Sequence, residues 1–164
     1  MTQFITQNII MTMTHYKLPR LLTVALATVA GIFSIQAQNK SLEQASSLPD
    51  VEYVYVTGKT LSQSENFGAG VCDDCIINSV EIITCGNNEQ LGKLNEIIDP
   101  IKNTMPLTSK VKENSRSLEL YSESGNGRIT RLLVLCTESD TSFTAVYITG
   151  DLDKEMLRSL HVDR

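Results

Sequence analysis

Residues 115–150 constrain the fold more than any other stretch, because they contain three strand-like segments separated by two short polar turns. Apolar and polar side chains alternate over residues 117–122, which is the period-two pattern of a half-buried strand. Residues 129–136 contain an unbroken apolar run over 132–135, which predicts a strand covered on both faces. Residues 143–149 are rich in β-branched and aromatic side chains, which indicates a third strand.

Two glycines and an asparagine at residues 124–127 supply the positive φ values that a hairpin turn needs. A second polar turn follows at residues 138–141. Upstream, residues 51–57 and 80–85 also have the composition and alternation of strands. Strands joined by short turns favour antiparallel pairing.

A helix is predicted after residue 86, with Asn87 as its N-cap and Gln90 reaching back as in a capping box. Its apolar face comprises Leu91, Leu94, Ile97, Ile98 and Ile101. Pro100 should kink this helix or end it near Asp99. Beyond it, the cluster of Lys110, Lys112 and Arg116 is typical of a solvated edge strand, in which lysines discourage further pairing.

Two further helical segments are expected, a short helix or loop at residues 59–64 and a terminal helix. The terminal helix is indicated by helical spacing of Leu152, Met156 and Leu160. The sequence therefore predicts one α+β domain over residues 50–164, a mostly antiparallel β-sheet with two or three helices packed on one face. An all-β sandwich is the main alternative.

The first 37 residues have the pattern of a signal peptide. Lys17 and Arg20 precede an apolar run over residues 21–35, and Ala37 is the small residue that a signal peptidase requires before its cut. The run is shorter than the roughly 20 residues of a spanning helix, although a retained anchor is the alternative. Two alternative translation starts are Met11 and Met13.

The exported chain would begin at Gln38 with a polar segment over residues 38–49, which we expect to be a flexible leader or a frayed helix. Removing the signal leaves twelve basic and nineteen acidic residues, a net charge of −7. This acidic balance disfavours nucleic acid and anionic lipid as partners. We expect a protein of the periplasm or cell envelope, without a stable membrane span after signal cleavage.

An even number of cysteines in an exported chain suggests disulfides. The candidates are Cys72, Cys75, Cys85 and Cys136. Cys72 and Cys75 are close enough along the chain to bridge in any fold. Cys85 and Cys136 pair only if their strands are neighbours and both side chains lie on one face. All three possible pairings, and free thiols, remain open.

The spacing of Cys72 and Cys75 is also that of a redox-active dithiol. Such a pair needs a thiolate stabilised by a helix N-terminus or a cation, whereas the two intervening aspartates oppose thiolate formation. A zinc site using all four thiolates is a further alternative, but there is no second Cys-x-x-Cys pair. A structural disulfide is the favoured interpretation.

Few residues are suited to acid–base or nucleophilic catalysis. The only histidines are His15 in the signal and His161 near the C-terminus, so a catalytic triad would depend on one terminal residue. Asp151 and Asp153 resemble paired catalytic carboxylates, but acidic side chains before a predicted helix are better explained as N-terminal helix residues. We predict no catalytic, cofactor-binding or metal-binding residues and no cofactor.

Residues 50–161 resemble a family of small exported proteins of Bacteroides-type bacteria, known as domain of unknown function number 4252. The resemblance rests on VEYVYVTGKTL, the SVEIIT strand before a helix, and the closing pattern ITRLLVLCTESDTSFTAVYITGDLDKEML. It implies an exported α+β domain with no assigned activity, no established cofactor and no catalytic residues to transfer. The Cys72–Cys75 segment and the absence of a long basic hairpin depart from that family.

The export signal, the acidity and the missing catalytic constellation favour a non-catalytic envelope protein that binds another protein or supports an assembly. The partner would be an envelope protein of unknown identity. The alternative function is that of an exported thiol–disulfide oxidoreductase using Cys72 and Cys75.

Overall fold

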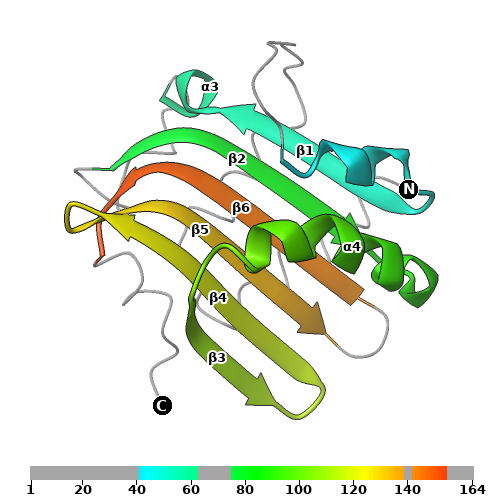
Figure 1. The fold of residues 1–164 in the computed structure, drawn as a ribbon. Helices are drawn as coiled ribbons and strands as arrows, with labels where there is room; N and C mark the ends of the chain where they lie inside the picture. The colour runs from blue at the N-terminus through cyan, green and yellow to red at the C-terminus, as the bar shows by residue number, and fades with distance from the viewer. Residues whose placement is uncertain (1–40, 63–74, 139–141, 155–164) are drawn as a thin grey trace.

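The computed structural model describes residues 41–62, 75–138 and 142–154 of the 164-residue chain. Figure 1 shows a single curved sheet crossed by one long helix. The elements follow in the order η2 (Glu43–Ser47), β1 (Val51–Thr57), α3 (Gly58–Ser62), β2 (Ile76–Cys85), η3 (Asn88–Gln90), α4 (Leu91–Lys102), β3 (Leu107–Glu113), β4 (Arg116–Gly125), β5 (Arg128–Glu138) and β6 (Ser142–Leu152). The predicted signal peptide and the terminal helix beyond residue 154 lie outside the described residues. The segment expected at residues 59–64 as a short helix or loop is helical in α3 as far as Ser62.

The six strands have the spatial order β1-β2-β6-β5-β4-β3, and every neighbouring pair is antiparallel. The predicted α+β class with a mostly antiparallel sheet is therefore confirmed. After α4 the chain crosses to the far edge of the sheet and returns strand by strand, so that β6 is inserted beside β2. This long-range pairing joins the two halves of the chain into one sheet.

The predicted central position of residues 129–136 is confirmed. β5 lies between β4 and β6, and Leu132 and Leu133, which point to opposite faces, are both 0% exposed. The turn before β5 also has the predicted chemistry, because Asn126 and Gly127 have φ values of 52° and 83°.

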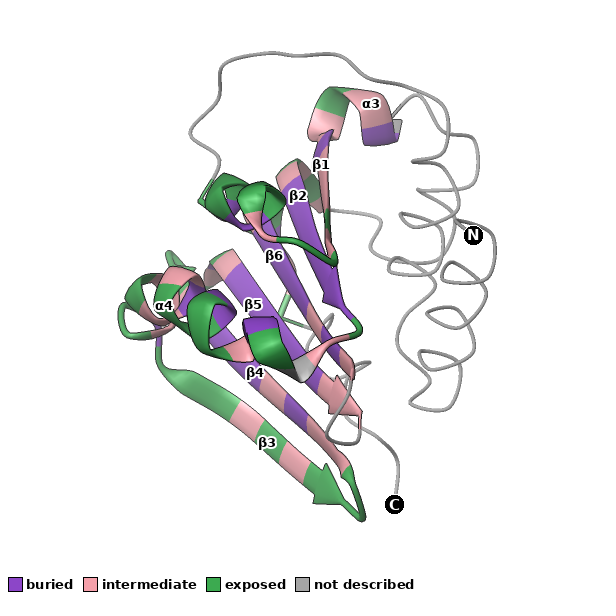
Figure 2. Cartoon of the chain, turned by 90° about the vertical axis from the view of Figure 1, so that its right-hand side faces the viewer, coloured by how far each residue is buried: buried purple, intermediate pink, exposed green. Residues whose placement is uncertain are grey.

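α4 covers one face of the sheet, as Figures 1 and 2 show. Its Leu94 and Ile98 are buried and pack in one cluster with Ile83 and Leu133 of the sheet. Of the two effects expected of Pro100, a kink or an end near Asp99, the end does not occur, because α4 continues through Pro100 to Lys102. Proline lacks an N–H donor and therefore removes one helical hydrogen bond, but the apolar face of α4 still anchors its last turn through the partly buried Ile101.

The predicted capping box does not form. The side chain of Asn87 accepts a hydrogen bond from the Glu89 amide at 3.0 Å, which starts the short helix η3 rather than α4. Gln90 then becomes the N-cap of α4 without a side-chain cap, and its buried Oε1 atom has no hydrogen-bond partner.

The opposite face of the sheet has its own apolar cluster, which includes Val80, Ile82, Leu132 and Ile148. Leu61 of α3 joins this second cluster, whereas α4 belongs to the first. The prediction that the helices share one face therefore does not hold for α3. Both faces of the sheet carry apolar side chains, as expected for central strands that are covered on two sides.

The segment over residues 38–49, expected to be a flexible leader or a frayed helix, is described from residue 41 onward and contains a short helix. η2 is a short 3₁₀ helix, and Leu42 and Ala45 are both 0% exposed. They pack in the same cluster as α4, which places this segment on the α4 face of the sheet. This mostly polar segment docks through the buried side chains of Leu42 and Ala45, because residues of the sheet and of α4 supply the rest of the apolar cluster.

Candidate functional site

One polar cluster contains several of the residues singled out in the sequence. Cys75 precedes β2, Arg128 begins β5, and Asp151 lies near the end of β6 with Asp153 just beyond it. Strand pairing brings them together, because β2 and β5 both pair with β6. Asp151 lies opposite Ile76 of β2, and the next residue, Leu152, lies opposite Ile129 of β5. The cluster lies where the starts of two strands meet the end of a third.

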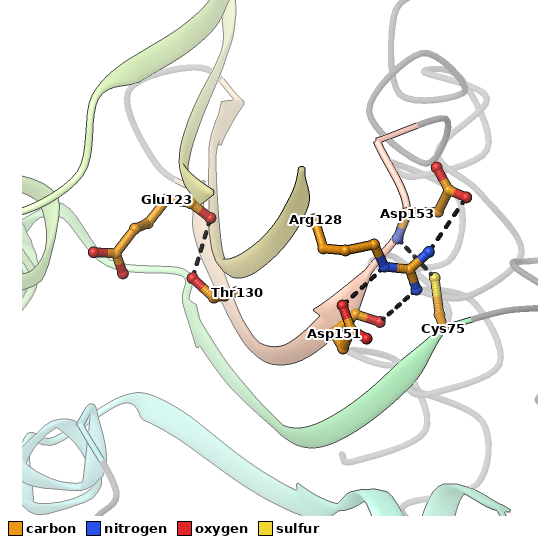
Figure 3. A network of polar contacts seen from close by, with 6 residues as sticks. All are labelled: Cys75, Glu123, Arg128, Thr130, Asp151 and Asp153. Atoms are coloured by element: carbon orange, nitrogen blue, oxygen red, sulfur yellow. Dashed lines mark hydrogen bonds and ion pairs between the residues drawn. The ribbon is translucent and has the colours of Figure 1, made fainter. Parts of the chain in front are cut away.

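Arg128 is at the centre of this cluster (Figure 3). Its Nε donates to Asp151 Oδ1 at 2.8 Å and its Nη2 to the Asp151 carbonyl at 3.1 Å. Its Nη1 lies 3.6 Å from Asp153 Oδ2. The backbone N–H of Asp153 donates to Cys75 Sγ at 3.2 Å. These contacts hold the end of β6 against the starts of β2 and β5.

The cation of this cluster, Arg128, is paired with the carboxylates of Asp151 and Asp153. A cation activates a thiol by stabilising its thiolate, and here the guanidinium binds two acidic side chains. The N–H donor from Asp153 acts in the other direction, since it can stabilise electron-rich sulfur. Most of these contacts are those of a structural clamp. The hydrogen bond from the Asp153 amide to Cys75 Sγ is the one contact that would also suit sulfur chemistry.

The expectation that Asp151 lies at the start of a helix is wrong, whereas the helix expected after Asp153 falls outside the described residues. Asp151 belongs to β6, which extends to Leu152, and both carboxylates pair with Arg128. The strand is longer than expected because Ile76 and Ile77 of β2 extend the pairing beyond Thr149. His161 and Cys72 lie outside the described residues.

The two remaining cysteines are far from this cluster and from each other. Cys85 is 1% exposed in the α4-face core, and Cys136 is 9% exposed in the opposite core. Their strands are separated by β6, and both thiols are free. The condition for a Cys85–Cys136 bridge is not met, and a zinc site of four thiolates is excluded by this geometry. Burial raises the pKa of Cys136 to about 11, which makes it a poor nucleophile.

Sequence reasoning missed Glu81, the most deeply buried charged residue in the part of the chain that the structure describes. It is 1% exposed on the α4 face of β2. Its Oε1 accepts a hydrogen bond from the Ser41 amide at 2.9 Å, and its Oε2 accepts from the Leu42 amide and the Tyr53 hydroxyl, both at 2.8 Å. Its position between Val80 and Ile82 in a mostly apolar part of β2 was a signal for such a role, but the two amide donors lie about forty residues away.

A second carboxylate–tyrosine pair lies on β4 and contacts both β3 and α4. Glu119 accepts from the Tyr121 hydroxyl at 2.7 Å and from Lys110 Nζ at 2.5 Å. Burial raises the pKa of Glu119, but the hydrogen bonds from Lys110 and Tyr121 outweigh burial and lower it overall. Lys102 of α4 lies over the Tyr121 ring, 5.7 Å from its centroid. This cluster attaches the edge strand to the sheet and to the helix.

Among the residues that the structure describes, no group of three or more histidine, cysteine or acidic side chains is arranged to hold a metal ion. In the same part of the chain, no helix has the length and apolar character needed to cross a membrane.

The fold and its polar clusters define an α+β protein built on one six-stranded antiparallel sheet. The chain belongs to the family described as "Domain of unknown function (DUF4252)", whose model matches residues 46–160. The match contains all six strands and α4. Neither a curated protein nor a solved structure matches the chain.

Proposed function

We propose that this chain is an exported, non-catalytic protein of the periplasm or cell envelope that binds another protein. The basis for export is the signal-like pattern of residues 1–37, with cleavage after Ala37. The basis for binding is the open edge of the sheet at β3. The two proposals are separable, because export concerns the leader and binding concerns a surface of the folded domain.

The open edge at β3 is the single observation that carries the binding proposal. β3 pairs with β4 on one side, and no strand of the described part pairs with its other side. Five of its seven residues are exposed, compared with one of seven in β1 at the opposite edge. Leu107, at the start of β3, is 50% exposed. Unpaired backbone groups beside an exposed apolar side chain suit the addition of a strand from a partner.

Charge restricts which strand can bind there. Lys110 already pairs with Glu119, and Lys112 is exposed two residues further along the same face. A second copy docked antiparallel around Lys110 would place like charges opposite each other, which is unfavourable. An extended segment with acidic side chains is therefore the favoured partner, and the lysines act against self-association.

The test is retention of an envelope partner by matched surface variants. The tagged exported protein is incubated with envelope extract, and bound proteins are compared between native, Leu107→Asp and Ile76→Asp forms. Ile76 is 64% exposed on β2 and controls for loss of an exposed apolar side chain elsewhere. We expect a partner that is lost only with Leu107→Asp. Equal retention by all three forms would contradict binding at β3.

We also propose a structural disulfide between Cys72 and Cys75. Cys85 and Cys136 keep free thiols, whereas Cys75 does not present a free thiol. The remaining cysteine of the chain is Cys72. A bridge here would close the end of the 63–74 segment next to the Arg128 cluster.

The second candidate function is that of a thiol–disulfide oxidoreductase using the same two cysteines. The observation in its favour is the Asp153 N–H that donates to Cys75 Sγ. The two functions are separated by an insulin-reduction assay on the native protein and on the Cys72→Ser, Cys75→Ser double variant. We expect no activity in either form, and activity that disappears in the double variant would reverse the ranking.

A further inference from the structure

The N-terminal segment over residues 41–48, here called the strap, is held on the sheet by Glu81. All three hydrogen-bond donors to this buried carboxylate are neutral, and two are successive backbone amides of the strap, from Ser41 and Leu42. Leu42 is also the N-cap residue of η2. Glu81 therefore binds the two amides that immediately precede η2, while Leu42 and Ala45 insert into the α4-face core.

A buried carboxylate is normally costly unless it is paired, yet none of the ion pairs among the described residues includes Glu81. Its charge is compensated by two backbone amides of the strap and by the Tyr53 hydroxyl. When the strap detaches, water replaces the two amides, so the carboxylate is satisfied in both states. Detachment of the strap is opposed mainly by exposure of the Leu42 side chain to water, which disfavours the detached state by roughly ten- to a hundredfold.

We propose that the strap is a reversible latch, and that Glu81, Tyr53 and the neighbouring core residue Ile83 form a binding site for a peptide segment that enters a helical turn. We refer to these three residues as the Glu81 site. Its ligand class is a peptide with two successive free backbone N–H groups, a leucine-sized side chain at the second of them, and a small apolar side chain three residues later. The strap is the resident ligand.

The Glu81 site is distinct from the proposed β3 edge, since β1 and β3 lie at opposite edges of the sheet. Its role also differs, because it recognises a helical turn whereas β3 would recognise an extended strand. A negative test of one site therefore does not bear on the proposal for the other.

Hydrogen exchange on the exported full-length chain tests the latch. We expect the amides of Ser41 and Leu42 to be protected in the native chain, and Glu81→Gln to lower this protection on the order of tenfold or more, because bonds to a charged acceptor are lost. Core amides of β5 should keep their protection. Glu52→Gln, an exposed acidic residue on β1, is the matched control. Unchanged protection in Glu81→Gln, or an equal loss across β5, would overturn the proposal.

A second measurement tests the peptide site itself in a full-length chain whose own strap is weakened by Leu42→Asp. The probe is a fluorescent peptide with the sequence of residues 40–49, KSLEQASSLP. We expect saturable binding to the Leu42→Asp chain, and at least tenfold weaker binding when Glu81→Gln is added. Absence of binding to the Leu42→Asp chain, or equal binding with and without Glu81→Gln, would show that the strap is only a fixed part of the fold.

Discussion

The hydroxyl of Tyr53 donates a hydrogen bond of 2.8 Å to Glu81 Oε2, and burial together with this bond raises the pKa of Tyr53 above its ordinary value. Tyr121 repeats the arrangement with Glu119, and burial and the hydrogen bond raise its pKa to about 12. The two pairs secure the sheet on either side of α4, one holding the strap and the other the edge strand.

Alkaline pH should therefore destabilise the protein through these tyrosines. The pKa of Tyr121 is 10.0 before burial and about 12 in the folded state, so the folded protein holds this proton more tightly. The contribution of Tyr121 to the free energy of unfolding is therefore complete below pH 10 and is lost as the pH rises toward 12. Urea unfolding at a series of alkaline pH values should show this loss, with a shallower decline in Tyr121→Phe. Stability that stays constant across this window would contradict the prediction.

Gly150 should tolerate no side chain. A Cβ atom at this position would lie 2.1 Å from the Ile76 carbonyl oxygen, where β6 passes the irregular start of β2. We expect Gly150→Ala to lower the free energy of unfolding by about 2 kcal/mol or more, since backbone must shift to relieve the clash.

Gly92 is the matched control, because it lies on the exposed side of α4 and a Cβ atom added there would meet no other atom within 4 Å. Gly92→Ala should raise stability by about 0.5–1 kcal/mol, as alanine is favoured over glycine inside a helix. Chemical denaturation measures both variants. Equal effects of the two substitutions would show that the close approach at Gly150 does not matter.

Arg128→Ala should loosen the end of β6 more than it destabilises the whole protein. Its ion pairs are partly exposed, with side-chain exposures of 30% for Arg128 and 54% for Asp151, so we expect a loss of about 0.5–1.5 kcal/mol. The Asp153 amide should exchange faster, because its position beside Cys75 depends on the clamp. Lys93→Ala on the exposed side of α4 is the control, and equal exchange in both variants would rule out a clamp.

The four cysteines should fall into two classes according to the conditions under which they are alkylated. Cys85 and Cys136 are buried free thiols, and the raised pKa of Cys136 further slows its alkylation. Alkylation of the native protein without reductant should label neither, whereas denaturant should expose both. Cys72 and Cys75 should be labelled only after reduction. Intact mass reads these states, and four labelled cysteines without reductant would refute the proposed bridge. The same spectrum reports whether the exported chain begins at Gln38.

The sequence was informative where structure is local. Alternation located the strands, and Asn126 with Gly127 correctly identified the β4–β5 turn. The pairing of β2 with β6 was not predictable in this way, because it joins segments about seventy residues apart. Asp151 was misassigned for the same reason, since Arg128 reaches it only through that sheet order. Glu81 was missed because its amide partners lie in a segment with no sequence periodicity.

The central claim, that β3 is the binding edge of an exported protein, is tested most directly by photocrosslinking from defined positions in the cell envelope. A photoreactive amino acid is placed at Lys112 on β3 and, in a separate variant, at Asn95 on the exposed side of α4. The account predicts that the probe at position 112 forms one discrete adduct with another envelope protein and that the probe at position 95 does not. Adducts of the same partner from both positions, or from neither, would contradict binding at the β3 edge.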